Sequence, residues 1–189
     1  MPAATHVGKQ RWRTDGSVIF TIKMTRRTGR KIRKDPIMEK RKIYIGADSA
    51  GYPLKEELAA YLRDNGYDVT DCGTDSTASC HYPEFASRVC EKVQGDLTGS
   101  FGILVCGTGI GMSMCANKYN GIRAAVCGDT YSAKMTRRHN DANVLCLGAR
   151  VIGSYLAQDI LDQFLSNEYE GGRHAIRVGM MADIEKKQH

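Results

Sequence analysis

The stretch Phe101-Gly-Ile-Leu-Val-Cys-Gly-Thr-Gly-Ile-Gly-Met-Ser113 decides how this chain folds. Its apolar run at 103–105 has the length of a buried parallel strand, and residues 112–118 beyond the glycine-rich turn are compatible with a helix. A strand, such a turn and a helix N-terminus form an anion cradle, because glycines admit a ligand close to the backbone and helix N–H groups point at it. The sequence therefore predicts that a phosphorylated small molecule binds here and that Cys106 acts on it.

From residue 41 onward, strand and helix patterns alternate along the chain. The strands are expected at 42–47, 67–72, 101–105, 122–127 and 143–148. The helices are expected at 53–63, from 83 onward, and at 112–118, 130–138, 155–165 and 175–186. We expect Asp129 and Ser154 to cap two of these helices, and Gly66 to follow the end of the first. This order predicts an α/β fold, a three-layer α/β/α sandwich around a five-stranded parallel, Rossmann-like sheet.

Three of the predicted strand ends carry residues suited to ligand binding. Asp48 and Ser49 follow the first strand. The glycine turn follows the third strand, and Arg150 follows the fifth. Because parallel sheets bind ligands beyond the carboxyl ends of their strands, we expect these residues to meet at one edge of the sheet.

The net charge of +6 is unevenly distributed. Residues 1–40 hold eleven basic and three acidic residues, a net charge of +8, whereas residues 41–189 have a net charge of −2. The near-neutral second part is the predicted globular domain, and its charge argues against nucleic-acid binding. For residues 1–40 we expect a disordered or non-native leader ahead of a start at Met38, because its basic and strand-like runs have no partner segment. An organelle transit peptide and a nucleic-acid-binding arm are the alternatives.

Seven cysteines, an odd number, indicate a reducing compartment, and we expect the protein in the cytoplasm. No two of them form a C-x-x-C pair, and no Cys/His set has zinc spacing, so no metal is expected. Several cysteines lie in strand-like apolar runs and are expected to be small buried residues. No apolar run has the length of a membrane span or the form of a secretory signal, so no membrane contact is expected.

The glycine turn lacks the common nucleotide-binding motifs. Residues 107–111 read G-x-G-x-G, which differs from the dinucleotide fingerprint, and no acidic residue follows the second strand early enough to bind a ribose. No G-x-x-x-x-G-K-[ST] is present, and Met112 stands where a cysteine-dependent phosphatase would close its loop with an arginine. The sequence therefore favours a phosphorylated ligand that is not a nucleotide.

Two side chains are candidates for proton transfer. Cys106 is either a buried strand-end residue or a reactive thiol. A free thiol with a pKa of about 8.5 is only a few per cent ionised at pH 7, and a glycine turn before a helix favours the thiolate. His139 lies in the run Arg137-Arg-His139-Asn-Asp141 and is a candidate acid or base, since imidazole titrates near neutrality. The alternative for this run is a solvated, cationic helix C-terminus.

Arg173 and Arg177 lie four residues apart near the start of the last predicted helix. If the helix has begun there, both guanidinium groups share one face and suit a phosphate dianion. Cations at a helix N-terminus oppose the helix dipole unless an anion is present. The alternative is an exposed helix start without a ligand.

Together these residues resemble the ribose-5-phosphate isomerase B family, which includes the galactose-6-phosphate isomerase subunits. The resemblance spans residues 42–187. The motifs that carry it are Cys106-Gly-Thr-Gly-Ile-Gly-Met-Ser113, Ala116-Asn-Lys118, Gly121-Ile-Arg-Ala124, Arg138-His-Asn-Asp-Ala-Asn143, Gly148-Ala-Arg-Val151 and Glu170-Gly-Gly-Arg-His174. The resemblance implies an enzyme that interconverts an aldose phosphate and a ketose phosphate through a cis-enediolate, without metal or cofactor. The expected pair is ribose 5-phosphate and ribulose 5-phosphate of the pentose phosphate pathway.

The resemblance also implies roles for individual residues. Cys106 would shuttle a proton between C1 and C2 of the sugar, and His139 would open the sugar ring. The backbone of Gly107, Thr108, Gly109, Ile110 and Gly111 would hold the enediolate oxygens. The implied phosphate ligands are Arg150, Arg173 and Arg177, and the implied substrate contacts are Asp48, Ser49 and Asn140. Family members are usually dimers with sites built from both subunits, which would bring the C-terminal arginines to the glycine turn; a tetramer is the alternative.

Two departures from the family pattern border the expected substrate. Many members have Asp-His where this chain has Asp48-Ser49, and many have an acidic residue where this chain has His81 before Tyr-Pro. Isomerisation of a six-carbon sugar phosphate, such as allose 6-phosphate or galactose 6-phosphate, is therefore an alternative. A phospho-sugar-binding module without activity is a further alternative, which the missing imidazole at Ser49 favours.

Overall fold

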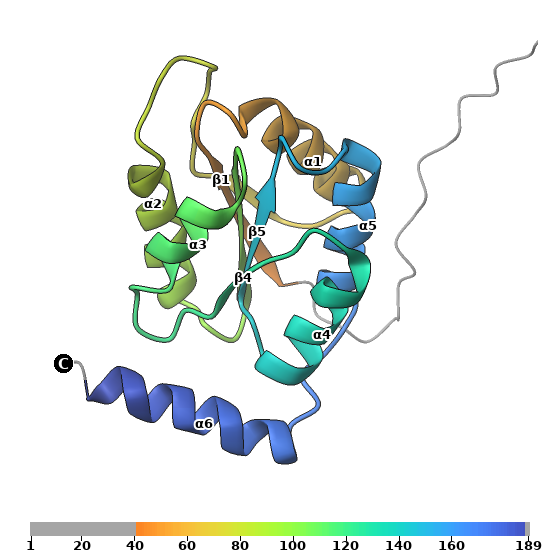
Figure 1. The fold of residues 1–189 in the computed structure, drawn as a ribbon. Helices are drawn as coiled ribbons and strands as arrows, with labels where there is room; N and C mark the ends of the chain where they lie inside the picture. The colour runs from red at the N-terminus through yellow and green to blue at the C-terminus, as the bar shows by residue number, and fades with distance from the viewer. Residues whose placement is uncertain (1–40, 188–189) are drawn as a thin grey trace, which may run out of the picture. The chain divides into compact units, whose positions relative to one another are not determined.

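The computed structural model describes residues 41–187, so the expectations for residues 1–40 lie outside the described part of the chain. The strands are β1 (Lys42–Ala47), β2 (Val69–Asp71), β3 (Ser100–Cys106), β4 (Ala124–Val126) and β5 (Val144–Gly148). The helices are α1 (Tyr52–Asp64), α2 (Tyr82–Gln94), α3 (Ile110–Ala116), α4 (Thr130–Asn140), α5 (Ser154–Leu165) and α6 (Arg173–Lys186). Strands and helices alternate as predicted, as Figure 1 shows.

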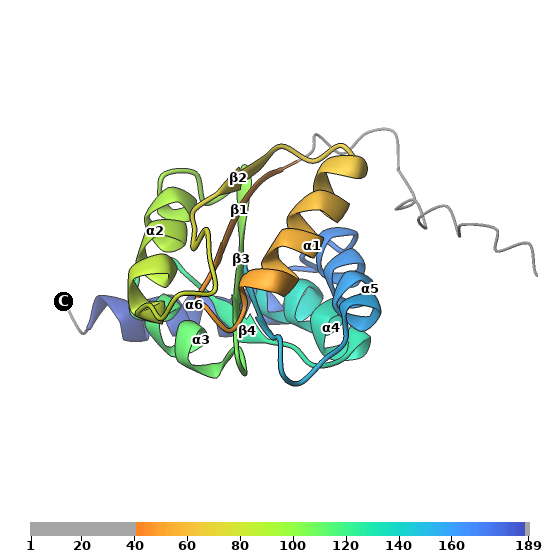
Figure 2. The same cartoon turned by 90° about the horizontal axis from the view of Figure 1, so that it is seen from above.

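All strand pairs are parallel, and the sheet has the order β2-β1-β3-β5-β4. Helices α2 and α3 cover one face of the sheet, and α1, α4 and α5 cover the other (Figure 2). The predicted three-layer α/β/α sandwich is therefore confirmed. The strand order changes direction between β1 and β3, so the segments that follow these two strands are neighbours at the carboxyl edge.

β3 is the central strand, and all seven of its residues are buried. Its side chains alternate between the two faces of the sheet. Ile103 and Val105 join the core under α1, α4 and α5, whereas Leu104 and Cys106 join the core under α2 and α3. The Cys106 side chain therefore leaves the sheet on the side of α3, at the last residue of the strand.

The edge strands β2 and β4 are shorter than predicted. At their amino ends, hydrogen bonds to a side chain or to the end of a helix take the place of strand pairing. The N–H of Arg123 donates to Oδ1 of Asn143, which ends the pairing of β4 at its amino end. The N–H of Tyr67 donates to the carbonyl of Leu62 in α1, so Tyr67 belongs to the turn that closes the helix. Gly66, at φ +76°, occupies that turn and follows α1 as predicted.

Two helix starts and one cap differ from the prediction. The carboxylate of Asp129 accepts from the N–H of Ser132 and caps α4 as expected. Ser154 is instead the first residue of α5, and Gly153 holds the cap position. Helix α3 begins at Ile110 and α6 at Arg173, each two residues early, because Gly109 and Gly172 take positive φ angles and complete the preceding turns. Within residues 41–187, every helix is too short or too polar to cross a lipid bilayer.

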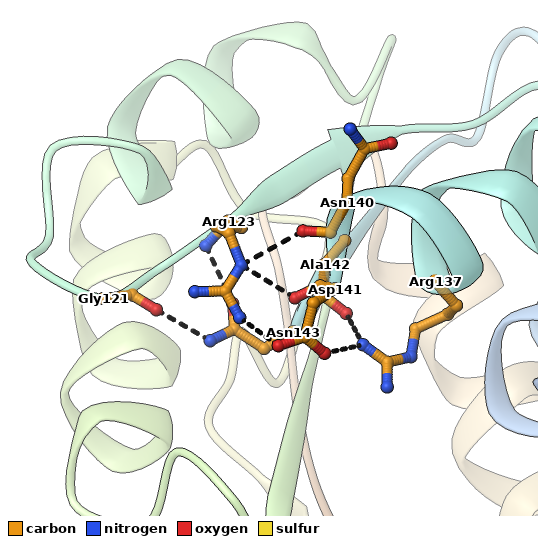
Figure 3. Close-up of polar contacts among 7 residues, drawn as sticks. All are labelled: Gly121, Arg123, Arg137, Asn140, Asp141, Ala142 and Asn143. Atoms are coloured by element: carbon orange, nitrogen blue, oxygen red, sulfur yellow. Dashed lines mark hydrogen bonds and ion pairs between the residues drawn. The ribbon is translucent and has the colours of Figure 1, made fainter. Parts of the chain in front are cut away.

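The C-terminus of α4 is held by a partly buried ionic network (Figure 3). Arg137 is 1% exposed and lies over the rings of Phe101 and Phe164, at 4.7 and 5.7 Å from their centroids. Its Nη1 donates to Oδ1 of Asp141 (2.9 Å) and to the carbonyl of Ala142 (2.6 Å). Arg137 is thus an internal anchor, and the predicted alternative of a solvated cationic helix end is wrong for this residue.

Asp141 is shared by two cations, since its other oxygen, Oδ2, accepts from Nη2 of Arg123 at 2.7 Å (Figure 3). It also ends α4 in the left-handed region, at φ +48°, which Asp and Asn tolerate better than other side chains. The Arg123 Nε reaches the carbonyls of Asn140 and Asp141 at 3.2 and 2.8 Å. These bonds fix the last turn of α4, which carries His139 and Asn140.

We predict that Asp141→Asn lowers the free energy of unfolding by about 2–3 kcal/mol, because it leaves the buried Arg137 cation without its counter-charge. Asparagine keeps the tolerance for the left-handed backbone, so the change isolates the charge. Denaturant unfolding measures the effect. Asp68→Asn, which removes an exposed carboxylate 3.9 Å from Lys42, is the control and should cost no more than about 0.5 kcal/mol. Equal stability of the two variants would contradict the prediction.

Candidate active site

The glycine turn places the Cys106 thiol under a backbone N–H group. Cys106 is 5% exposed, and its Sγ accepts from the N–H of Gly109 at 3.1 Å. Gly109 has φ +79°, and an added Cβ would lie 3.1 Å from the backbone of Leu147, so only glycine fits without strain. Thr108 is exposed, and its Oγ1 accepts from the N–H of Ile110 at 3.3 Å. The turn therefore presents backbone donors beside a nearly buried sulfur.

The segment after β5 continues the ladder of β3 beyond the strands. The N–H of Ala149 donates to the carbonyl of Cys106 (2.8 Å), and that of Arg150 donates to the carbonyl of Gly107 (3.0 Å). A Cβ at Gly148 would lie 2.8 Å from the carbonyl of Thr108, so the two backbones touch there. These contacts hold the exposed Arg150 against the glycine turn, as predicted.

The segment after β1 packs against the same turn. The Asp48 Oδ1 accepts from the N–H groups of Ala50 (3.0 Å) and Gly51 (2.9 Å), which shapes the turn into α1. A Cβ at Gly51 would lie 2.2 Å from the carbonyl oxygen of Val105, so this turn reaches the end of β3 only through glycine. Ser49 lies half-buried in the turn. The expected meeting of the segments after β1, β3 and β5 at one edge is confirmed by these contacts.

Tyr82 is a neighbour of the glycine turn, and no role was predicted for it. A Cβ at Gly111 would lie 3.0 Å from the Tyr82 ring, and the ring is 41% exposed. The tyrosine in the His81-Tyr-Pro run was therefore the feature of the sequence from which a side chain lining the turn could have been predicted.

A second polar cluster lies at the opposite edge of the sheet, where α4 ends and α6 begins (Figure 1). The imidazole rings of His139 and His174 stack with 4.1 Å between centroids and 7° between planes. The Nε2 atom of each histidine lies 3.7 Å from Oε2 of Glu170, and Glu170 also pairs with Arg138. The N–H of Glu170 donates to the carbonyl of Arg138 at 3.0 Å, which ties the segment before α6 to α4. Glu170 and His174 belong to the motif at residues 170–174 that supports the family resemblance, but no role was predicted for either side chain.

His174 is 7% exposed, and its pKa lies below the ordinary value. Burial is the main cause, followed by the neighbouring His139 and Arg173, whereas Glu170 acts in the opposite direction. The Nε of Arg173 donates toward Nε2 of His174 at 3.5 Å, which fits an imidazole without a proton on that nitrogen. A neutral His174 is therefore the form that these contacts favour.

The cluster of His139, Glu170 and His174 has three potential metal ligands within 4.8 Å of one another. Its geometry does not suit a metal ion, because a ligating imidazole keeps the ion in its ring plane and these two planes are stacked. The cationic Arg138 and Arg173 beside the cluster oppose a cation further. The arrangement suits proton transfer and anion binding instead.

Arg173 and Arg177 begin α6 and are both exposed. Their spacing of one helical turn places both guanidinium groups on one face, as predicted. The Asn140 side chain at the end of α4 points away from the network of Asp141 (Figure 3). The amino edge thus presents Arg173, Arg177 and Asn140 together with the histidine pair.

The predicted site residues therefore fall into two groups at opposite edges of the sheet. Cys106 ends β3, whereas His139 precedes the start of β5, and the two strands run side by side in register. Four steps along a strand, from Val144 to Gly148, already span about 13 Å, whereas a proton donor must lie within about 3 Å of its acceptor. One chain does not bring the two groups together.

Comparison with known proteins gives the family. The sequence model of the family described as "Ribose/Galactose Isomerase" matches residues 43–181. The chain belongs to this family. A relative named ribose-5-phosphate isomerase B from Escherichia coli is 47% identical over 149 residues, which cover 79% of this chain and 99% of the relative. The predicted family is thereby confirmed.

Two further relatives carry different sugar names. A crystal structure of ribose-5-phosphate isomerase B from Mycoplasma genitalium with bound ribulose-5-phosphate superposes with a TM-score of 0.75 at 38% identity, covering 77% of this chain and 96% of that one. A relative from Pectobacterium atrosepticum named D-erythrulose-4-phosphate isomerase is 46% identical over 147 residues, covering 77% of this chain and 96% of the relative. Relatives named for a five-carbon and for a four-carbon sugar phosphate are thus similar to this chain at comparable sequence identity.

Proposed function

We propose that this protein is an aldose–ketose isomerase that interconverts ribose 5-phosphate and ribulose 5-phosphate. The observation that carries the proposal is the glycine turn, where the N–H of Gly109 reaches the Cys106 thiol and the backbone of Arg150 is bonded to Gly107. Nearly full-length similarity to the isomerase of Escherichia coli supports the same activity. The seven thiols are free, which supports a reducing compartment such as the cytoplasm.

The proposed reaction is a proton transfer within the sugar. The Cys106 sulfur removes the proton from C2 of the open-chain aldose, and the electron pair moves through the C1–C2 bond onto the aldehyde oxygen. The cis-enediolate that forms is stabilised by backbone donors of residues 107–111. The proton of the C2 hydroxyl moves to O1, and the proton held by Cys106 returns to C1, which gives the ketose and restores the thiolate. His139 transfers the proton that opens the furanose ring, and no step requires a metal or a redox cofactor.

We propose further that two copies of the chain complete each site. The carboxyl edge of one copy supplies Cys106, the glycine turn and Arg150, and the amino edge of its partner supplies the second group. That second group consists of His139, Asn140, Arg173 and Arg177. Such an arrangement joins the proton base to the ring-opening group without any distortion of the sheet.

Exposed apolar side chains at both edges support this homodimer. On α6, Ile176, Met180 and Ile184 form a stripe with a spacing of four residues, and they are 69%, 61% and 58% exposed. Near the carboxyl edge, Val151 and Tyr155 are 65% and 84% exposed. Large apolar side chains of this exposure are typical of surfaces that a partner covers.

The sugar preference has two alternatives within the same reaction class. The name of the Pectobacterium relative favours a four-carbon substrate, and the departures at Ser49 and His81 leave a six-carbon substrate as the second alternative. A phospho-sugar-binding module without activity is the least favoured reading, because the thiol, the histidine and the arginines are all present.

We predict that the protein isomerises ribose 5-phosphate with a kcat/KM at least about tenfold above that for erythrose 4-phosphate or allose 6-phosphate. Parallel initial-rate measurements on the three aldose phosphates test the proposal. A higher rate on a four- or six-carbon sugar would reassign the substrate. Absence of turnover on all three, with retained binding of a sugar phosphate, would favour the non-catalytic module.

Removal of the thiol is expected to abolish turnover without abolishing binding. Cys106→Ala should lower kcat by about 10²–10⁴-fold, because it deletes a positioned proton-transfer group and no phosphate ligand. Calorimetric titration with ribose 5-phosphate should still detect binding. Cys115→Ala, at a half-buried cysteine on α3, is the matched control and should keep its activity. A Cys106→Ala variant with more than about a tenth of the wild-type rate would rule out the base.

Composite sites make a distinct prediction for mixed dimers. Cys106→Ala damages one edge and His139→Asn damages the other, so each homodimer should be inactive. After the two variants are unfolded together and refolded, half of the dimers are mixed, and each mixed dimer has one intact site. The recovered rate should approach about a quarter of the wild-type rate. A mixture as inactive as its components would show that one chain carries the whole site.

A further inference from the structure

The stacked histidines at the amino edge form a unit with Glu170, although the proposed reaction uses only His139. The carboxylate oxygen Oε2 of Glu170 lies 3.7 Å from Nε2 of both imidazoles. The other oxygen faces Arg138, and the backbone N–H of Glu170 is bonded to the carbonyl of Arg138. Glu170 therefore has a fixed position relative to the last turn of α4.

Two charged imidazoles 4.1 Å apart would repel each other, whereas an imidazolium on a neutral ring is attracted to its π face. The stack thus favours a single proton. The charged groups that face it are Arg138 on α4, Glu170 on the preceding segment, and Arg173 and Arg177 on α6.

These charges are arranged unequally around the two rings. His174 is buried, and its Nε2 receives the N–H of Arg173, so a proton on that nitrogen would meet a donor. The Nε2 of His139 lies at the same 3.7 Å from the carboxylate as that of His174, but His139 is only half-buried, with a side chain 34% exposed. The single proton is therefore more stable on His139 than on His174.

We propose that Glu170 and His174 are positioning residues that place one proton on Nε2 of His139, ready for the ring-opening step. Glu170 supplies the negative charge that favours the imidazolium, and the neutral His174 ring supplies the face on which it stacks. This inference rests on the proposed function, because it assigns His139 the role of ring-opening acid. It adds two residues that act through His139 and need no contact with the sugar.

The kinetic test is a double-mutant cycle on ribose 5-phosphate turnover by the full-length protein. Glu170→Gln should lower kcat about tenfold with KM within about twofold of wild type, since the change affects proton transfer and spares the arginines. In a His139→Asn background, the same change should alter kcat by less than about twofold. Glu168→Gln removes an exposed carboxylate from the same segment and is the control for charge alone. Equal losses in both backgrounds, or a rise in KM alone, would overturn the proposal.

The proton itself is observable without substrate. In protein labelled with ¹⁵N-histidine, the His139 ring signals should titrate at lower pH in Glu170→Gln than in wild type, because the carboxylate stabilises the protonated ring. His174→Asn is a second variant with the same expected direction, and it covers the case in which Glu170→Gln fails to fold. A His139 titration that neither variant shifts would overturn the proposal. Because this measurement needs no turnover, it is informative even if the wild-type protein isomerises no sugar phosphate.

Discussion

The site at the carboxyl edge depends on the backbone pairing of β3 with the segment after β5. Two hydrogen bonds, from Ala149 to Cys106 and from Arg150 to Gly107, extend the ladder past the ends of the strands. They hold the glycine turn against the segment after β5, and within the turn the N–H of Gly109 reaches the Cys106 sulfur. The glycines at 51 and 148 are required because neighbouring backbones fill the space of a Cβ. The chemistry of the turn is thus set by main-chain packing in the centre of the sheet.

The amino edge is organised by charge. Arg137 is buried against two phenylalanine rings and is neutralised by Asp141, which also binds Arg123. Burial of Arg137 carries a desolvation cost, and its ion pair with Asp141 fixes the last turn of α4, from which the Asn140 side chain points away from the network. Main-chain packing at one edge and ion pairing at the other therefore present two different kinds of functional surface.

Much of the fold was predictable because the sequence features that determine its strands, turns and helix ends act on residues close to them in the chain. The apolar run before the glycine turn, the Asp129 cap and the glycine after α1 each act within a few residues. The burial of Arg137 was not predictable, because it depends on Phe101 and Phe164, which come from distant segments. The roles proposed for Glu170 and His174 were not predictable for the same reason, since only the docking of the segment before α6 onto α4 brings these residues to His139. Cys106 and Arg150 were correctly gathered at one edge, because the rule for parallel sheets depends only on strand direction.

The direction of the sheet has one more consequence. A chain whose proton base and ring-opening histidine lie at opposite edges holds only half of the proposed reaction, however well it folds. In the proposed homodimer, turnover would follow the association equilibrium, so specific activity would fall on dilution below the dissociation constant of that dimer, and substrate that bridges two copies would stabilise their association. With sites shared in this way, the polarity of five parallel strands would couple the rate of a proton transfer to the concentration of the protein.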